Sequence, residues 1–521
     1  MLRSRSGRCS RILSAVSRVG GPALLGAVLF SPAAWAAGFT AAENRLPGDP
    51  EWQLSKPAVG REIEGYASRA SVAPGESLIL HVSTPSRWFD TRIYRLGWYA
   101  GSGARRMADV RNSSGGLRET PRPRAGDGLV ACRWPESVRF RIGTGWPSGV
   151  YLARLTASDT GRQAFVPFVV RGSRAPYLLL VNTNTWQAYN AWGGTSLYDF
   201  NSAGGARATR VSYDRPYASG PGAWAGLGAG ELLTTPHTAR KAGWEYPMIR
   251  WLEREGVDVA YAADVDLHSH PRLLQGRRGV LIAGHSEYWS RAMRDRLEQA
   301  RDRGTGLALF GANAGYWQVR YEPSPSGAPD RVLFCAKEPA RDPLYDTRAD
   351  RDLTVRFRNL HPRRPEVALL GVMTARGEAD VEGDFTPAPE ARRSWVYRGT
   401  GIARGATPSL PGLVGYESDR TFQGDSLYGR WSPPRLQVVA RSPIRFPDGS
   451  VERSDAVAYA APSGAVVFAA GTVQWAWGLD DWGAPWLRPA RRHPDAERIT
   501  LNVIDALGAG AAPGPSSRSP R

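Results

Sequence analysis

Two hydrophobic patterns follow one another along this chain, and the change between them falls near residue 171. Before that point, short alternating runs are separated by turn residues such as those at 72–76, and none is long enough for a helix. This pattern predicts an immunoglobulin-like β-sandwich over residues 37–172. The predicted strands are 63–67, 77–83, 90–96, 138–142, 149–158 and 163–170.

After residue 171, apolar strand-like runs alternate with amphipathic stretches, which predicts a mostly parallel, doubly wound sheet over residues 173–507. The clearest helix is 290–303, where Ser290 is placed to cap the start and Gly304 to end it. The chain is therefore expected to be a multidomain β plus α/β protein. The predicted strands are 177–181, 257–262, 279–283, 306–311 and 465–470, and long excursions are expected at 322–351 and 375–407.

The two ends of the chain differ in character from the rest. Five arginines precede an apolar run at 22–30 and a small-residue cleavage pattern at Ala34–Trp35–Ala36, which predicts a signal peptide over residues 1–36. We therefore expect a periplasmic or secreted protein. After residue 36 no run of about twenty apolar residues occurs, so no transmembrane segment is expected in the mature chain. Residues 508–521 are predicted to be a disordered tail.

The charge pattern bears on nucleic-acid binding, and the cysteine content bears on disulfide formation. The formal net charge is +18, and nearly all of the basic residues are arginines, since lysine occurs only at Lys56, Lys241 and Lys337. The arginines alternate with acidic residues instead of gathering on one helix face, so no nucleic-acid partner is predicted. Outside the expected signal peptide only Cys132 and Cys335 remain, either as a disulfide or, as we favour, as two buried thiols.

Two polar and aromatic runs each follow a predicted apolar strand. One spans Asn184–Gly194 and the other spans Gly284–Ser290. Ligands bind at the carboxyl ends of the strands in open α/β sheets, so we expect both runs to contribute to a functional site.

Three kinds of site compete for these runs. Residues 284–288 begin like the elbow of a serine hydrolase, but the bulky Tyr288 stands where that turn needs glycine, so Ser286 is disfavoured as a nucleophile. A carbohydrate-binding surface is an alternative, although aromatic side chains cover a core equally well. The tryptophans in question are Trp186, Trp192, Trp289, Trp317, Trp475, Trp477 and Trp482.

The third alternative is a metal site made of oxygen donors. Glu287 supplies a carboxylate and His285 precedes it by two residues. Tyr189 comes from the other run, and Tyr213 and Tyr217 flank a loop made stiff by a proline. Phenolate is a hard anionic ligand that suits a trivalent iron.

Several motifs together resemble the large-subunit family of N,N-dimethylformamidase. This resemblance covers residues 60 to 505 and implies a second domain with a glutamine-amidotransferase-like sheet that lacks the cysteine nucleophile. It also implies hydrolysis of a formamide-type C–N bond in a small-molecule amide, and a small partner subunit or a homo-oligomer. The motifs are 93–99, 100–105, 184–194, 214–217, 284–290 and 310–313.

The resemblance also implies a mononuclear non-haem iron held by two tyrosines and one glutamate. The metal ligands that match best are Tyr189, Tyr217 and Glu287, with Tyr213 competing for the second tyrosine and Tyr198 for the first. A non-catalytic cell-envelope or glycan-binding protein on the same scaffold is the alternative function. The further polar positions that match, expected to be catalytic, are His285, Asn313, Lys337 and Glu417.

Overall fold

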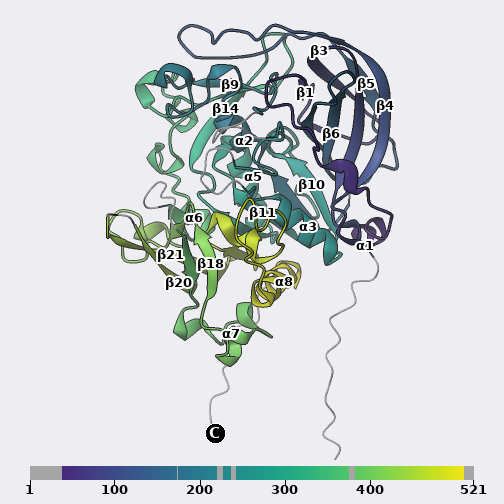
Figure 1. Cartoon of the computed structure of the whole chain (residues 1–521). Helices are drawn as coiled ribbons and strands as arrows, with labels where there is room; N and C mark the ends of the chain where they lie inside the picture. Colours follow the sequence, from purple (N-terminus) through teal and green to yellow (C-terminus); the bar gives the residue numbers. More distant parts are fainter. Residues whose placement is uncertain are drawn as a thin grey trace, which may run out of the picture.

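The computed structural model describes residues 38–509 except 173, 220–226, 236–241, 375–381 and 447. The chain is a mixed α/β protein with several sheets and few helices, and its N-terminal strands pack beside a central parallel sheet (Figure 1). The predicted signal peptide and most of the predicted tail lie outside the described residues. No helix within the described ranges is long and apolar enough to cross a membrane.

The N-terminal strands are organised around β3, a strand of 20 residues. Its first part pairs with β1 and β5, and its later part pairs with β4 and β6. Leu80 from the first part and Ile93 from the later part meet in one buried core, so both parts of β3 contribute to the core of this region. The strands are β1 (Glu64–Ala67), β2 (Ser71–Val72), β3 (Ser77–Leu96), β4 (Ala104–Gly116), β5 (Val138–Arg141), β6 (Gly149–Ala157) and β7 (Gln163–Val170).

This region differs from the sequence prediction in two respects. The segments expected as two strands, 77–83 and 90–96, form one continuous strand. The strand β4 was not predicted, because most of its side chains are polar and at least partly exposed and it carries no apolar alternation.

The central sheet has the strand order β10-β8-β11-β13-β22-β21-β20. Its first five strands run parallel, as predicted, and all of them are buried. The last two are antiparallel and were not predicted. The strands are β8 (Tyr177–Val181), β10 (Val259–Ala263), β11 (Gly279–His285), β13 (Gly306–Ala312), β20 (Gln437–Arg445), β21 (Val451–Ala460) and β22 (Val466–Ala469).

Smaller sheets are formed by segments that follow the strands of the central sheet. One has the order β12-β14-β15-β9, and the other two are pairs, β16 with β19 and β17 with β18. The excursions expected at 322–351 and 375–407 contain β15 and β17 respectively. The strands are β9 (Arg210–Ser212), β12 (Tyr288–Ser290), β14 (Trp317–Glu322), β15 (Val332–Phe334), β16 (Met373–Thr374), β17 (Glu382–Phe385), β18 (Leu410–Gly415) and β19 (Asp419–Arg420).

The helices are short, apart from the last. The predicted helix at 290–303 is α5, and its cap is the Ser290 hydroxyl, which accepts a hydrogen bond from the Met293 N–H at 3.2 Å. The last helix runs through Ala509, the end of the described residues. The helices are α1 (Phe39–Glu43), α2 (Thr183–Tyr189), α3 (Tyr246–Arg254), α4 (Asp264–Ser269), α5 (Arg291–Asp302), α6 (Val367–Leu370), α7 (Gly401–Arg404) and α8 (Pro494–Ala509).

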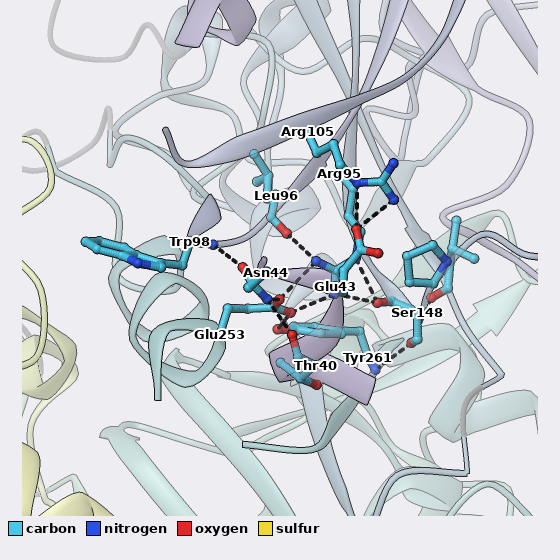
Figure 2. Close-up of polar contacts among 12 residues, drawn as sticks. Thr40, Glu43, Asn44, Arg95, Leu96, Trp98, Arg105, Ser148, Glu253 and Tyr261 are labelled. Atoms are coloured by element: carbon cyan, nitrogen blue, oxygen red, sulfur yellow. Dashed lines mark hydrogen bonds and ion pairs between the residues drawn. The ribbon is translucent and has the colours of Figure 1, made fainter. Parts of the chain in front are cut away.

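A buried ion pair joins the N-terminal strands to the central domain. Arg95 of β3 donates two hydrogen bonds, of 2.9 and 2.8 Å, to the carboxylate of Glu253 on α3 (Figure 2). The two side chains are 1% and 0% exposed. The Tyr261 hydroxyl donates to the same carboxylate at 2.7 Å, and the guanidinium also donates to the Ser148 carbonyl. Both charges are therefore fully compensated away from water.

The two cysteines among the described residues, Cys132 and Cys335, are both buried and free. Cys132 packs with Trp134 and Trp192, whereas Cys335 lies in a different hydrophobic cluster. The disulfide is absent from the described structure, and the two-thiol interpretation is confirmed.

Replacement of Glu253 by glutamine is expected to destabilise the protein by about 3–5 kcal/mol, because it leaves the Arg95 guanidinium buried without its counter-charge. Denaturant unfolding measures the change. The matched control is Glu136→Gln, which breaks the exposed pair with Arg139 and should leave stability nearly unchanged. Equal effects of the two substitutions would contradict a structural role for the buried pair.

Candidate active site

The ends of three neighbouring parallel strands bring the candidate residues together. β8 leads into α2, whose last residue is Tyr189. β11 ends in His285 and is followed by Glu287, and β13 is followed by Asn313. The register pairs His285 with Ala312, so Asn313 follows directly beside the histidine. Parallel pairing thus gathers residues that are far apart in the sequence at one edge of the sheet.

The carboxylate of Glu287 is the point on which two tyrosine hydroxyls converge. Tyr189 donates to it at 3.0 Å, and Tyr198 donates at 2.9 and 2.8 Å to its two oxygens. The two phenol rings stack with centroids 4.3 Å apart. Glu287 is 3% exposed, and its N–H donates to the Thr185 hydroxyl at 3.0 Å. Two phenol oxygens and one carboxylate, all of a kind that binds hard metal ions, therefore contact one another in a buried site.

The charge balance of this group explains its protonation. Burial alone would raise the pKa of Glu287, but the hydrogen bond and charge of His285, together with the charge of Lys337, hold that pKa below its usual range. Burial and then the Glu287 charge raise the pKa values of Tyr189 and Tyr198 well above 10. With the protein groups alone, both tyrosines are neutral phenols that donate to one carboxylate.

His285 lies between carboxylates from different parts of the chain. Its Nε2 is 2.9 Å from Glu417 and 3.4 Å from Glu287, and its Nδ1 is 3.7 Å from Glu231. Burial opposes the charge on the imidazole, but the carboxylates outweigh it and raise the pKa of His285 well above its usual value. A charged imidazolium that bridges Glu417 and Glu287 is the result.

Asn313 supports the same group from the end of β13. Its side-chain amide donates to Glu417 at 3.1 Å. Its backbone has a φ of 50°, an uncommon conformation for a residue with a side chain. Its side-chain carbonyl is buried and accepts no hydrogen bond from any described residue. Such a group is suited to meeting a ligand.

Lys337 lies in an aromatic surround next to the tyrosines. Its Nζ is 3.4 Å from the centroid of the Tyr198 ring, and it also faces Trp317 at 5.0 Å. Burial lowers the pKa of Lys337 to about 8, although the Glu287 carboxylate opposes that shift. Contacts with aromatic faces stabilise the charged form of such an ammonium group.

The structure places Tyr217 and Tyr213 away from Glu287. Tyr217 packs edge-on against Trp186 at a centroid distance of 6.1 Å, and the Tyr213 hydroxyl donates to Asn184 at 2.7 Å. Both line a cavity of about 30 Å³ between the N-terminal strands and the central domain. The structure thus brings together the predicted residues Tyr189, Glu287, His285, Asn313, Lys337 and Glu417. Tyr198, predicted as a competitor for the first tyrosine, also contacts Glu287.

Tyr198 reaches the site because the chain folds back after α2. Gly193 and Gly194 have φ values of 78° and 95°, which side-chain-bearing residues rarely adopt. After this turn the Leu197 N–H donates to the Ala188 carbonyl at 2.9 Å, so the next residue lies over Tyr189. The Gly-Gly pair was the signal in the sequence that could have indicated this return.

The structure gives little support to the serine-hydrolase site or to the carbohydrate-binding surface. The Ser286 hydroxyl is buried and accepts a hydrogen bond from the Trp289 indole at 2.9 Å, which makes it part of the packing. Of the seven tryptophans considered for sugar stacking, five are buried and present no open face; these are Trp186, Trp192, Trp289, Trp475 and Trp477.

The sequence reasoning missed Asp419, which anchors the loop of Glu417 to the end of β13. Its carboxylate accepts a hydrogen bond from the Asn313 backbone N–H at 3.0 Å, and its own N–H donates to Gly471. Asp419 is 1% exposed, and burial raises its pKa to about 7. Because it lies two residues after Glu417, it fixes both partners of the Asn313–Glu417 hydrogen bond.

Fold and site together define a mixed α/β protein with a buried polar cluster at the carboxyl ends of parallel strands. Within that class, the chain belongs to the family described as N,N-dimethylformamidase beta subunit-like, C-terminal, which matches residues 90–490. A curated relative, the N,N-dimethylformamidase beta subunit of an Alcaligenes species, is 25% identical over 378 residues. The matched region is 61% of this chain and 45% of the relative, so it spans less than half of the relative's length.

The Asp419 carboxyl predicts a pH dependence of stability. Because its pKa in the folded protein is raised, ionisation costs stability as pH rises from about 4 to about 7. Asp419→Asn cannot ionise but keeps an oxygen for the Asn313 N–H. Its stability relative to the natural chain should therefore rise between pH 4.5 and 7.5, on the order of 3 kcal/mol. Denaturant unfolding at both pH values measures this, and a constant difference would contradict the raised pKa.

Proposed function

We propose that the chain is an exported hydrolase of a C–N bond in a small amide of the formamide type, which uses a mononuclear non-haem iron. The observation that carries this proposal is the convergence of the Tyr189 and Tyr198 hydroxyls on the Glu287 carboxylate. Membership of the family matched at residues 90–490 supports the hydrolase class. The name of the relative, a dimethylformamidase, supports an amide substrate.

The proposed ligand set is Tyr189, Tyr198 and Glu287, with Tyr198 in place of the Tyr217 that the motifs favoured. Two phenolates and one carboxylate are hard, anionic oxygen donors that suit a trivalent iron. A cation bound among these three side chains would lower the pKa values of both tyrosines, which burial and the Glu287 charge otherwise raise. Among the described residues no group of three or more His, Cys, Asp or Glu side chains is arranged for a metal ion, so a tyrosine-based set is the alternative that fits.

The residues around the proposed ligands supply the proton chemistry. When bound, the iron would polarise the amide carbonyl and make water a stronger nucleophile. Glu417, oriented by His285 and Asn313, accepts the proton of the attacking water and returns it to the leaving nitrogen. The Lys337 ammonium group stabilises negative charge that develops on the carbonyl oxygen. The aromatic surround of Lys337 and the burial of Glu417 exclude bulk water from these steps.

The finer architecture and the setting belong to the same proposal. We propose that the N-terminal strands form an immunoglobulin-like sandwich and that the central sheet is glutamine-amidotransferase-like. The alternation of strand pairing around β3 and the five parallel strands support these assignments. The Ala34–Trp35–Ala36 pattern supports export to the periplasm or beyond. The relative's description as a beta subunit supports assembly with a second, smaller subunit or with further copies.

The ligand assignment predicts different spectra for two tyrosine variants. Iron-loaded protein should show visible tyrosinate-to-iron absorption, which Tyr198→Phe should diminish or remove together with bound iron. Tyr217→Phe is the matched control and should leave both unchanged, since Tyr217 packs against Trp186. Loss of the colour in the Tyr217 variant, with retention in the Tyr198 variant, would restore the ligand set that the motifs favoured.

The proton-transfer role of Glu417 predicts a selective loss of turnover. Glu417→Gln should lower kcat for hydrolysis of small formamides by about 10²–10⁴-fold, because an amide cannot accept the proton from water. Iron content should remain as in the natural chain, since Glu417 is not a proposed ligand. Amine release measures the rate, with the exposed Glu390→Gln as the control variant. Undiminished turnover in the Glu417 variant would contradict the assigned role.

A further inference from the structure

A cleft rich in arginine opens at the end of the central sheet opposite the candidate active site. It has a volume of about 620 Å³ and is lined by segments just before β11 and β13 and by the end of α8. The active-site residues follow the other ends of the same two strands. Since β11 is 7 residues long, the two sites are separated by roughly 20 Å of sheet.

Five arginines line this cleft, and no acidic side chain does so among the described residues. The arginines are Arg272, Arg277, Arg278, Arg296 and Arg303. Burial lowers the pKa values of Arg277 and Arg296, which shows that these two guanidinium groups are partly withdrawn from water. Arg272, Arg278 and Arg303 are exposed at the mouth.

The acidic residues of the neighbouring helix α5 are engaged elsewhere. Glu298 pairs with Arg294 and Arg364, and Asp302 pairs with Arg301. Asp295 pairs with Arg291 and Arg364, although its charge also acts on Arg296. Residues 510–521 contain no Asp or Glu side chain. The Arg296 guanidinium donates to the Leu267 and His268 carbonyls. Arginines elsewhere in the described chain commonly pair with carboxylates, whereas Arg272, Arg278 and Arg303 form no ion pair within the described ranges. Their mutual repulsion therefore favours an anion from outside the chain.

We propose that this cleft binds a small, multiply charged anion of the oligophosphate class. Guanidinium groups match phosphate oxygens with paired hydrogen bonds, and the three exposed groups of Arg272, Arg278 and Arg303 around one cleft favour several negative charges on one ligand. The cleft volume lies in the range that encloses one small molecule. A recessed cleft of this size favours a compact ligand over the flat surface of a membrane or the length of a nucleic acid. Neither the iron nor the hydrolytic reaction enters this inference.

Calorimetric titration of the purified protein with inorganic tripolyphosphate tests the proposal. We expect one site per chain, weakened by added salt. Arg278→Gln combined with Arg303→Gln should weaken binding by about tenfold or more, because each guanidinium removes charge-assisted hydrogen bonds. The matched control combines Arg122→Gln with Arg393→Gln, two exposed arginines outside the cleft, and should bind as the natural chain does. Thermal unfolding verifies that each variant folds.

Several results would overturn the proposal. Absence of binding at low salt would show that the cleft is not an anion site. Equal weakening of binding in both variant pairs would show that tripolyphosphate responds only to the overall positive charge of the protein. Citrate bound as tightly as tripolyphosphate would exclude phosphate as the selected chemistry. Binding of phosphatidylglycerol vesicles through Arg278 and Arg303, without binding of tripolyphosphate, would identify a membrane as the partner instead.

Discussion

The close approach of β11 and β13 at their carboxyl ends is the constraint on which the candidate site depends. The two strands remain in parallel register as far as His285 and Ala312, so their following residues emerge side by side. A Cβ at Gly311 would lie 2.1 Å from the Gly284 carbonyl oxygen, which leaves no space for any other residue there. Gly284 itself has a φ of 66°, which turns the chain toward Glu287. Two glycines therefore fix the distance between His285 and Asn313.

The charges gathered by these strand ends face opposite charges within the protein. The Glu287 and Glu417 carboxylates face the His285 imidazolium, and Lys337 lies within an aromatic surround nearby. Burying such charges is costly unless each is paired, and here the partners come from several separate segments. Outside the candidate site, the buried Arg95–Glu253 ion pair likewise joins separate segments, because it fixes the N-terminal strands against α3. The polar chemistry of this protein thus depends on long-range contacts.

Much of this arrangement follows from local sequence pattern, and part of it does not. The strands at 177–181, 279–283 and 306–311 were predictable because continuous apolar runs are bounded by polar motifs, and those motifs predicted the convergence of Tyr189, His285, Glu287 and Asn313. Tyr198 was predicted only as a competitor for the first tyrosine, because its contact with Glu287 depends on a backbone reversal after α2 and not on a motif. The polar strand β4 was missed because its stability comes from pairing with β3. Asp419 was missed because its role exists only through a contact 106 residues distant in sequence.

We propose that Tyr189, Tyr198 and Glu287 together hold one iron ion. Anomalous X-ray diffraction at the iron absorption edge, from crystals of the iron-loaded protein, locates that ion directly. We expect a single strong anomalous peak among the oxygens of the three side chains, with Tyr217 outside its coordination sphere. A peak bound by Tyr217, or iron-loaded crystals without a peak beside Glu287, would contradict it.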